Sequence, residues 1–242
     1  MRILLLFISI SILLTSCWDL RTGPDIEGFA PGTWRGVFKL DDQAVPIIYE
    51  IKNSNNDKPI EFIFKTEQQI IAADSAIIWG DTLFAYFGAS DTYLKIIHQV
   101  DQMDGFLYDN TKAEYPIPFA GIYGIQHRFP DVRKTPKANL TGEWKLIATV
   151  EKDSTLEGIL RISTNGENKA TASLQFPTYP QKIYLEGTVQ ASKIHLSGFD
   201  GRKVCWISAN IESDKKLTQG NLKLNNQGYF WEAESNAGVS NQ

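Results

Sequence analysis

The chain has 242 residues, of which 43% are hydrophobic and 12% aromatic, so it holds enough apolar side chains to build one large or two small cores. The 28 acidic residues outnumber the 24 basic ones and give a net charge of −4 at pH 7. This balance argues against a nucleic-acid partner, because phosphates would require a basic surface.

The first 16 residues have the layout of a secretory signal peptide. Met1 and Arg2 form a short positive region, and a mostly apolar run of twelve residues, 3–14, follows it. Twelve residues are too few to cross a bilayer as a helix, which takes roughly 20. We therefore expect residues 1–16 to be removed on export.

The four residues Leu14-Thr15-Ser16-Cys17 resemble the lipobox of bacterial lipoproteins. The resemblance implies that the thiol of Cys17 receives a diacylglyceryl group and becomes the first residue of the mature chain. Its acyl chains would then hold the protein on a bacterial membrane, facing the periplasm or the cell surface, with the Gram-negative outer membrane favoured. The alternative is a plain secreted protein in which Cys17 carries no lipid.

Most of the chain after residue 31 alternates apolar and polar side chains with the period of two that is typical of half-buried strands. In chain order the clearest segments are GTWRGVFKL (32–40), VPIIYEIK (45–52), PIEFIFK (59–65), TLFAYFG (82–88), TYLKIIHQV (92–100), GEWKLIATV (142–150), ATASLQF (170–176), KIYLEGTV (182–189) and GYFWEAE (228–234). Clusters of turn-forming residues separate them, and no window predicts a long amphipathic helix. The fold class is therefore predicted to be all-β.

The two halves of the chain share short sequence features. Gly32-Thr33-Trp34 matches Gly142-Glu143-Trp144, 110 residues later, and each half also contains an Asp-Gly turn. With about eight strands in each half, we expect two consecutive antiparallel up-and-down barrels or curled sheets. Coincidence between two β-rich halves with common turn chemistry is the alternative. The predicted parts are a signal peptide (1–16), a tether (17–31), a first β-barrel-like domain (32–126), a linker (127–139), a second β-barrel-like domain (140–234) and a tail (235–242).

A Gly-x-Trp on the first strand of such a barrel resembles the calycin superfamily, which includes the lipocalins. The resemblance implies that Trp34 closes one end of the first barrel and that an arginine after the last strand, here Arg128, packs over it. Trp144 would close the second barrel, but no arginine follows its last strand.

A second resemblance covers most of the mature chain. Segments such as GTWRGVF, YPIPFAGIYGIQHRF and GRKVCWISANI are similar to the region that precedes the thioredoxin domain in exported thiol-disulfide reductases of Gram-negative bacteria. Those proteins act through a Cys-x-x-Cys motif, which this sequence does not contain. The resemblance thus implies an accessory or binding module, and it transfers no catalytic residue.

After processing, Cys205 would be the remaining free thiol. It alternates in step with Ile207, Ala209 and Ile211, which predicts an inert side chain on a buried strand face. The alternative is a reactive thiol activated by Arg202 or Lys203.

The histidines give no metal or catalytic pattern. His98, His127 and His195 lack the spacing of a zinc site, and no nucleophile elbow or phosphate-binding loop occurs. His98 should be half-buried in line with Leu94 and Ile96, whereas His195 should face solvent. No catalytic residue, metal or cofactor is therefore predicted.

The aromatic residues are too many for two narrow cores, so some should lie on exposed faces or rims. The set is Trp79, Phe84, Tyr86, Tyr93, Tyr108, Tyr115, Tyr123, Tyr179, Tyr184, Phe199 and Trp206. The barrel interiors are expected to be filled by large side chains. The sequence therefore predicts a non-enzymatic, membrane-anchored lipoprotein that binds a small apolar ligand or docks a protein. The alternative is an accessory component of extracytoplasmic thiol-disulfide redox without its own thioredoxin domain.

Overall fold

A computed structural model describes residues 29–52, 59–99, 101–111, 116–130, 134–150, 154–165 and 168–236. Within these ranges the regular secondary structure consists of strands and one short 3-10 helix, Gly88–Ser90, so the predicted all-β class is confirmed. The signal peptide, Cys17, most of the tether and Tyr115 lie outside the described residues.

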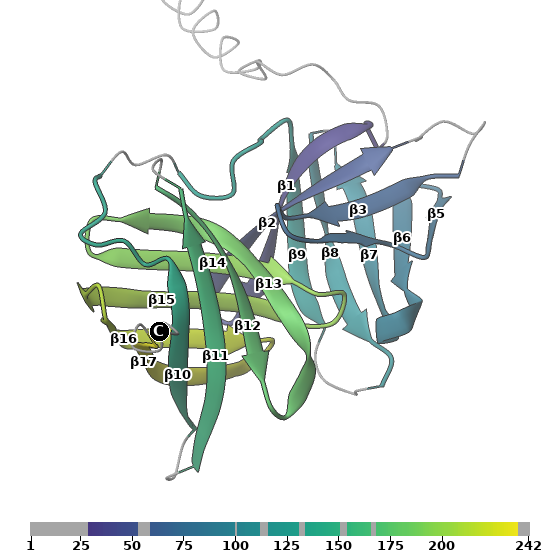
Figure 1. Ribbon diagram of the computed structural model, residues 1–242. Coiled ribbons are helices and arrows are strands. Elements are labelled where there is room, and N and C mark those ends of the chain that lie inside the picture. Colours follow the sequence, from purple (N-terminus) through teal and green to yellow (C-terminus); the bar gives the residue numbers. More distant parts are fainter. Residues whose placement is uncertain are drawn as a thin grey trace, which may run out of the picture.

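The first domain is one open sheet of nine antiparallel strands. They are β1 (Gly32–Leu40), β2 (Gln43–Lys52), β3 (Glu61–Lys65), β4 (Ile70–Ala72), β5 (Ser75–Trp79), β6 (Thr82–Phe87), β7 (Thr92–Gln99), β8 (Gln102–Asp109) and β9 (Ile117–Tyr123). Their spatial order is β4-β3-β2-β1-β9-β8-β7-β6-β5. The sheet curls into a half-barrel whose free edges are β4 and β5 (Figure 1).

The second domain is a closed barrel of eight antiparallel strands (Figure 1). They are β10 (Gly142–Val150), β11 (Ser154–Thr164), β12 (Lys169–Phe176), β13 (Tyr179–Gln190), β14 (Lys193–Phe199), β15 (Val204–Ser213), β16 (Lys216–Leu224) and β17 (Gln227–Ser235). Strands follow one another in chain order, and β17 pairs with β10 to complete the ring. The up-and-down arrangement expected from the sequence is therefore confirmed, with one half closed and the other open.

The two domains begin with the same local structure. Gly32 and Gly142 both have a positive φ, +134° and +148°, which a residue with a side chain rarely adopts. Two residues later, the indole nitrogens of Trp34 and Trp144 donate to backbone carbonyls four residues upstream, over 3.0 and 2.9 Å. The Gly-x-Trp match between the halves therefore corresponds to a shared structural motif.

Large inward-facing side chains fill both domains, as the alternation of the strands predicts. All eight strands of the second barrel contribute to one apolar cluster that includes Trp144, Trp231 and Leu174. In the first domain, Trp34 and Tyr49 are fully buried at the centre of the corresponding cluster.

The two domains share a hydrophobic core. Phe199 and Trp206, on β14 and β15 of the second barrel, are buried in the cluster of the first domain. The ring of Phe199 lies 4.8 Å from that of Phe64 and 5.3 Å from that of Phe38, measured between centroids. The second barrel thus covers the open side of the half-barrel.

Candidate functional site

The described part of the chain gives no metal centre. Within it, no group of three or more His, Cys, Asp or Glu side chains is placed so as to hold a metal ion. No helix in the same residues is long and apolar enough to cross a membrane. The features that remain are the exposed outer face of the first sheet and the polar junction between the domains.

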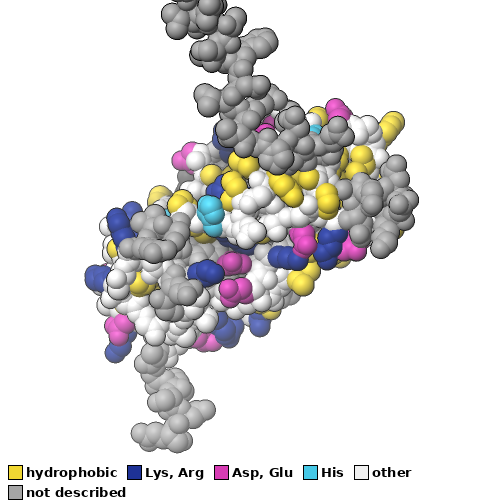
Figure 2. All heavy atoms as spheres, turned by 90° about the horizontal axis from the view of Figure 1, so that it is seen from above, with side chains coloured by type: hydrophobic (Ala, Val, Ile, Leu, Met, Phe, Trp, Pro, Cys, Tyr) yellow, Lys and Arg dark blue, Asp and Glu magenta, His cyan; other side chains and the backbone are white. Residues whose placement is uncertain are grey.

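Five large apolar side chains are exposed on the outer face of the first sheet, and we call them the outer patch. The exposed fractions are 55% for Ile77, 81% for Trp79, 40% for Ile97, 42% for Phe106 and 39% for Ile122. The patch crosses strands β5 to β9, and Figure 2 shows hydrophobic side chains gathered over the first domain in the face that it displays. Large exposed apolar side chains gathered on one face of a sheet are typical of an interaction site.

The strand register explains why these residues face outward. On β6, Leu83, Ala85 and Phe87 are buried in the domain interior, so the alternating residues between them point to the outer face. Trp79 pairs with Thr82, and Thr82 pairs in turn with Ile97, which places the indole and the isoleucine in one row across three strands.

A row of aromatic rings lies beside the outer patch. The ring centroids of Tyr86 and Tyr93 are 5.6 Å apart, and those of Tyr93 and Tyr108 are 4.9 Å apart with only 10° between the ring planes. Partial burial raises the pKa of Tyr93, and the two neighbouring tyrosines raise it further. The rings stack against one another across the strands, and such cross-strand pairs stabilise the sheet.

The second domain has a much smaller exposed apolar surface. Among its described residues, Ile147 and Phe230 are the large hydrophobic side chains that are mainly exposed. They line a groove of about 340 Å³ on the outside of β10, β16 and β17, together with charged residues such as Lys145 and Glu232. The apolar asymmetry between the domains makes the outer patch the stronger candidate for an interaction site.

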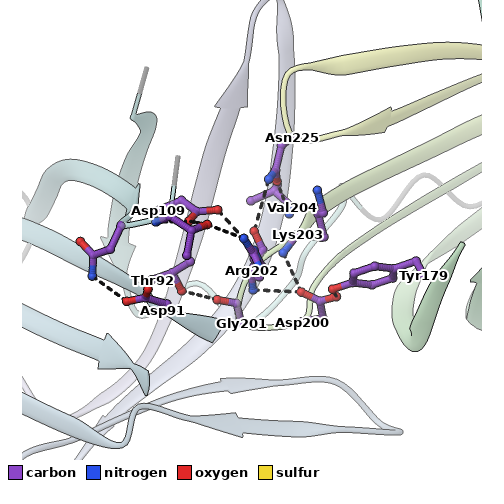
Figure 3. A network of polar contacts seen from close by, with 12 residues as sticks. Asp91, Thr92, Asp109, Tyr179, Asp200, Gly201, Arg202, Lys203, Val204 and Asn225 are labelled. Atoms are coloured by element: carbon purple, nitrogen blue, oxygen red, sulfur yellow. Dashed lines mark hydrogen bonds and ion pairs between the residues drawn. The ribbon is translucent and has the colours of Figure 1, made fainter. Parts of the chain in front are cut away.

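A network of polar contacts ties the two domains together (Figure 3). The Arg202 guanidinium, on the β14–β15 turn, lies 3.3 Å from the Asp109 carboxylate at the end of β8. Partial burial raises the pKa of Asp109, but hydrogen bonds from Thr111 and the charge of Arg202 outweigh this effect and hold the pKa below its usual value. Thr92 on β7 donates to the carbonyl oxygen of Gly201 in the same turn.

Hydrogen bonds within the β14–β15 turn stabilise the turn. The Asp200 carboxylate accepts hydrogen bonds from the backbone N–H groups of Arg202 and Lys203 and from the Tyr179 hydroxyl, the last over 2.8 Å. Burial and the Asp200 charge raise the pKa of Tyr179 well above its usual value, so the hydroxyl stays protonated. All of these groups belong to the second domain, so their hydrogen bonds stabilise the turn that carries Arg202, and the contact of Arg202 with Asp109 joins the domains.

Arg128 belongs to the junction between the domains. Its guanidinium donates to the carbonyl oxygen of Ser197 on β14 over 2.7 Å and to that of Lys65 on β3 over 3.1 Å, and it lies 3.6 Å from the Glu186 carboxylate. These contacts do not place it over Trp34 as the calycin resemblance implied. The physical reason is that a buried guanidinium needs acceptors, and the junction provides one carbonyl oxygen from each domain together with the Glu186 carboxylate.

Trp34 is enclosed by other aromatic rings. Its ring stacks on Tyr49 at 6.1 Å and meets Tyr123 edge-on at 5.0 Å, measured between centroids. Trp144 has the equivalent buried position in the second barrel. Both tryptophans are therefore buried, and Trp34 has aromatic neighbours where an arginine was expected; their closing role remains a prediction.

The structure places Cys205 in the interior of the second barrel. Its side chain is fully buried, and burial raises the pKa of the thiol well above its usual value. The predicted buried position is therefore confirmed. Because thiol chemistry requires an accessible thiolate, this environment opposes reactivity.

The two described strand histidines differ in how well the sequence predicted them. His98 is half-buried beside Phe29, with its ring 5.6 Å away, as expected. His195 was predicted to face solvent, but it is half-buried against Trp206 at 5.6 Å in the junction. Burial and the nearby charge of Lys193 lower the pKa of His195, which keeps the imidazole neutral at pH 7. The prediction for His195 was wrong because the outer face of β14 is covered by the first domain.

We expect alkylation of Cys205 to require unfolding. In a mature chain that carries Cys17→Ala, the native protein should react with N-ethylmaleimide at least about 100 times more slowly than the urea-denatured protein, because the reagent reaches the thiol only after local or global opening. Intact mass spectrometry at successive times measures both rates. Equal rates would contradict the buried position and would restore the redox alternative.

Comparisons with known proteins assign no function to this chain. No family model and no curated protein matches it. Among solved structures, a protein of unknown function from Nostoc punctiforme, assigned to the DUF3598 family, is similar over 85% of this chain and 96% of its own, with a TM-score of 0.29 and 11% sequence identity. At this level of similarity no residue role transfers.

Proposed function

We propose that this protein is an exported lipoprotein, anchored to a bacterial membrane through an acylated Cys17, and that it serves as a non-enzymatic docking module. The outer patch is the single observation that carries the docking role. Its indole and aliphatic side chains lie on regular strands, so the surface is preformed and needs little ordering on binding.

The packing of the interiors supports docking on the surface over binding inside a barrel. Large side chains such as Trp34, Trp144 and Trp231 are buried in the two interiors, which favours filled cores over a binding cavity. The open side of the half-barrel is also covered, because Phe199 of the second barrel packs into it. A ligand-binding role in the manner of lipocalins would require a hollow interior.

The redox alternative has less support. It needs an accessible thiol of low pKa, whereas Cys205 is fully buried and its pKa is raised. The nearby cations do not change this, because the Arg202 guanidinium is engaged with Asp109.

Replacing Cys17 by alanine should move the protein from the detergent phase to the aqueous phase. Two or three acyl chains give stable anchoring, whereas a protein without them depends on weaker surface contacts. Detergent phase partitioning of the full chain expressed in a Gram-negative host, together with the intact mass of the product, measures the change. Cys205→Ala is the matched control and should still be acylated. An unmodified Cys17 in the mature protein would overturn the anchored role.

A further inference from the structure

Two of the five outer-patch residues lie beside the point where the chain enters the fold. The ring of Phe29, the first described residue, contacts His98 at 5.6 Å, and the Tyr123 hydroxyl donates to the carbonyl oxygen of Pro31. Ile97 precedes His98 on β7, and Ile122 precedes Tyr123 on β9. Successive residues of a strand point to opposite faces, so Ile97 and Ile122 lie on the outer face while the contacts of Phe29 and Pro31 are made on the inner one. The segment that leads from Cys17 therefore meets the fold at the same end of the sheet as these two patch residues.

The length of that segment keeps the patch close to whatever holds Cys17. Residues 18–28 and their two flanking residues span at most about 40 Å even when fully extended. Once Cys17 is anchored, contact between the outer patch and the bilayer no longer requires a diffusional encounter. The tether gives the patch a high effective concentration at the bilayer, which favours even a weak apolar contact.

The composition of the patch matches the interface of a bilayer. Trp79, 81% exposed at the end of the β5–β6 hairpin, joins an aliphatic surface to a polar indole N–H, and tryptophan is enriched where membranes meet water. Charges of both signs lie among these side chains. Asp81, Asp101 and Asp104 are exposed, and Asp104 pairs with Ile97 across β7 and β8, whereas the exposed Lys95 pairs with Phe106 across the same two strands.

We infer that the outer patch rests on the lipid surface to which the chain is anchored, with Trp79 inserted at the level of the headgroups. The membrane is then both the anchor and the docking partner of this face. This inference rests on the proposed function for its biological setting, but the contact itself does not need the acyl chains. Trp79 and Ile97 provide the main apolar area, and Ile122 holds the edge nearest the anchored segment.

The test uses the mature chain with Cys17→Ala, so that binding reports on the patch alone. Co-sedimentation with phosphatidylcholine vesicles should show weak, saturable binding. Trp79→Ser should weaken that binding about tenfold, because burial of a large apolar side chain is lost. Phe230→Ser, which removes an aromatic side chain that is 75% exposed on the second domain, is the matched control and should leave binding unchanged.

Further controls keep the result interpretable. Trp79→Ser and Phe230→Ser both change exposed residues, so their melting temperatures should equal that of the parent chain. Ile97→Ser serves as a second patch variant, which should also weaken vesicle binding. Absence of vesicle binding by the parent chain, or equal losses in the Trp79 and Phe230 variants, would overturn the inference. Self-association of the parent that Trp79→Ser abolishes, without vesicle binding, would also overturn it and assign the patch to a second copy. Acylation of Cys17 is measured separately by mass, so failure of the anchor and failure of the patch are distinguishable.

Discussion

Replacing Phe199 by alanine should destabilise the whole protein by about 3–5 kcal/mol, because it leaves a large cavity in a core that two domains share. The ring is 3% exposed and lies 4.8 Å from Phe64 and 5.6 Å from Phe87, both in the first domain. Urea unfolding followed by tryptophan fluorescence measures the change. We also expect the single unfolding transition of the parent to separate into two, because the half-barrel loses its cover.

Phe230→Ala is the control for this experiment. Its side chain is 75% exposed on the same barrel, so its removal should change the free energy of unfolding by no more than about 0.5 kcal/mol. A change of less than about 1 kcal/mol in the Phe199 variant would contradict the shared core, since buried phenylalanine residues normally contribute more.

The second large effect is expected at Trp34, the fully buried tryptophan of the first domain. Trp34→Ala should lower the free energy of unfolding by about 3–5 kcal/mol, because the indole is fully buried among Tyr49 and Tyr123 and its N–H satisfies the Ala30 carbonyl. Trp34→Phe should recover part of the loss by filling the space without the hydrogen bond. Chemical denaturation with far-ultraviolet circular dichroism measures both variants.

Trp79→Ala provides the contrast within the same domain. The side chain is 81% exposed, so the same chemical change should leave stability within about 0.5 kcal/mol of the parent. A Trp34 variant as stable as the Trp79 variant would show that the Gly-x-Trp motif does not close the sheet. The comparison also confirms that Trp79 can be used to test binding without a loss of folding.

These two experiments address how the outer patch is held in place. The half-barrel has two free edges, β4 and β5, and Trp79 lies on the second of them. The contacts of Phe199 and the clamp between Arg202 and Asp109 hold the sheet against the barrel from its open side. We therefore expect the second domain to stabilise the curvature of the first sheet, and with it the arrangement of the outer patch.

The alternation of side chains predicted much of the local structure. The segment GTWRGVFKL coincides with β1, and GEWKLIATV coincides with β10. Alternation is a property of neighbouring residues, so it is visible in the sequence wherever one face of a strand is buried. The short strands β4 and β5 were not predicted, because three to five residues at a sheet edge show little contrast between faces.

The candidate site was predicted in part. Trp79 and Tyr86 were expected on an exposed face and are found there. Phe199 and Trp206 belonged to the same expected group, yet both are buried between the domains. A strand in a barrel has an outer face in any case, and the sequence does not show whether another domain covers that face.

The sequence by itself determined the strand-rich class, the Gly-x-Trp start of each half and the inward position of Cys205, because each depends on a pattern within one short segment. The tertiary structure alone decided that one half closes and the other stays open, and that Arg128 and His195 lie in a junction. It also brought Trp79, Ile97 and Ile122, from three different strands, onto one face of the first sheet, at the end where β1 begins. These features depend on contacts between residues far apart in the chain, for which a single sequence carries no periodic signal.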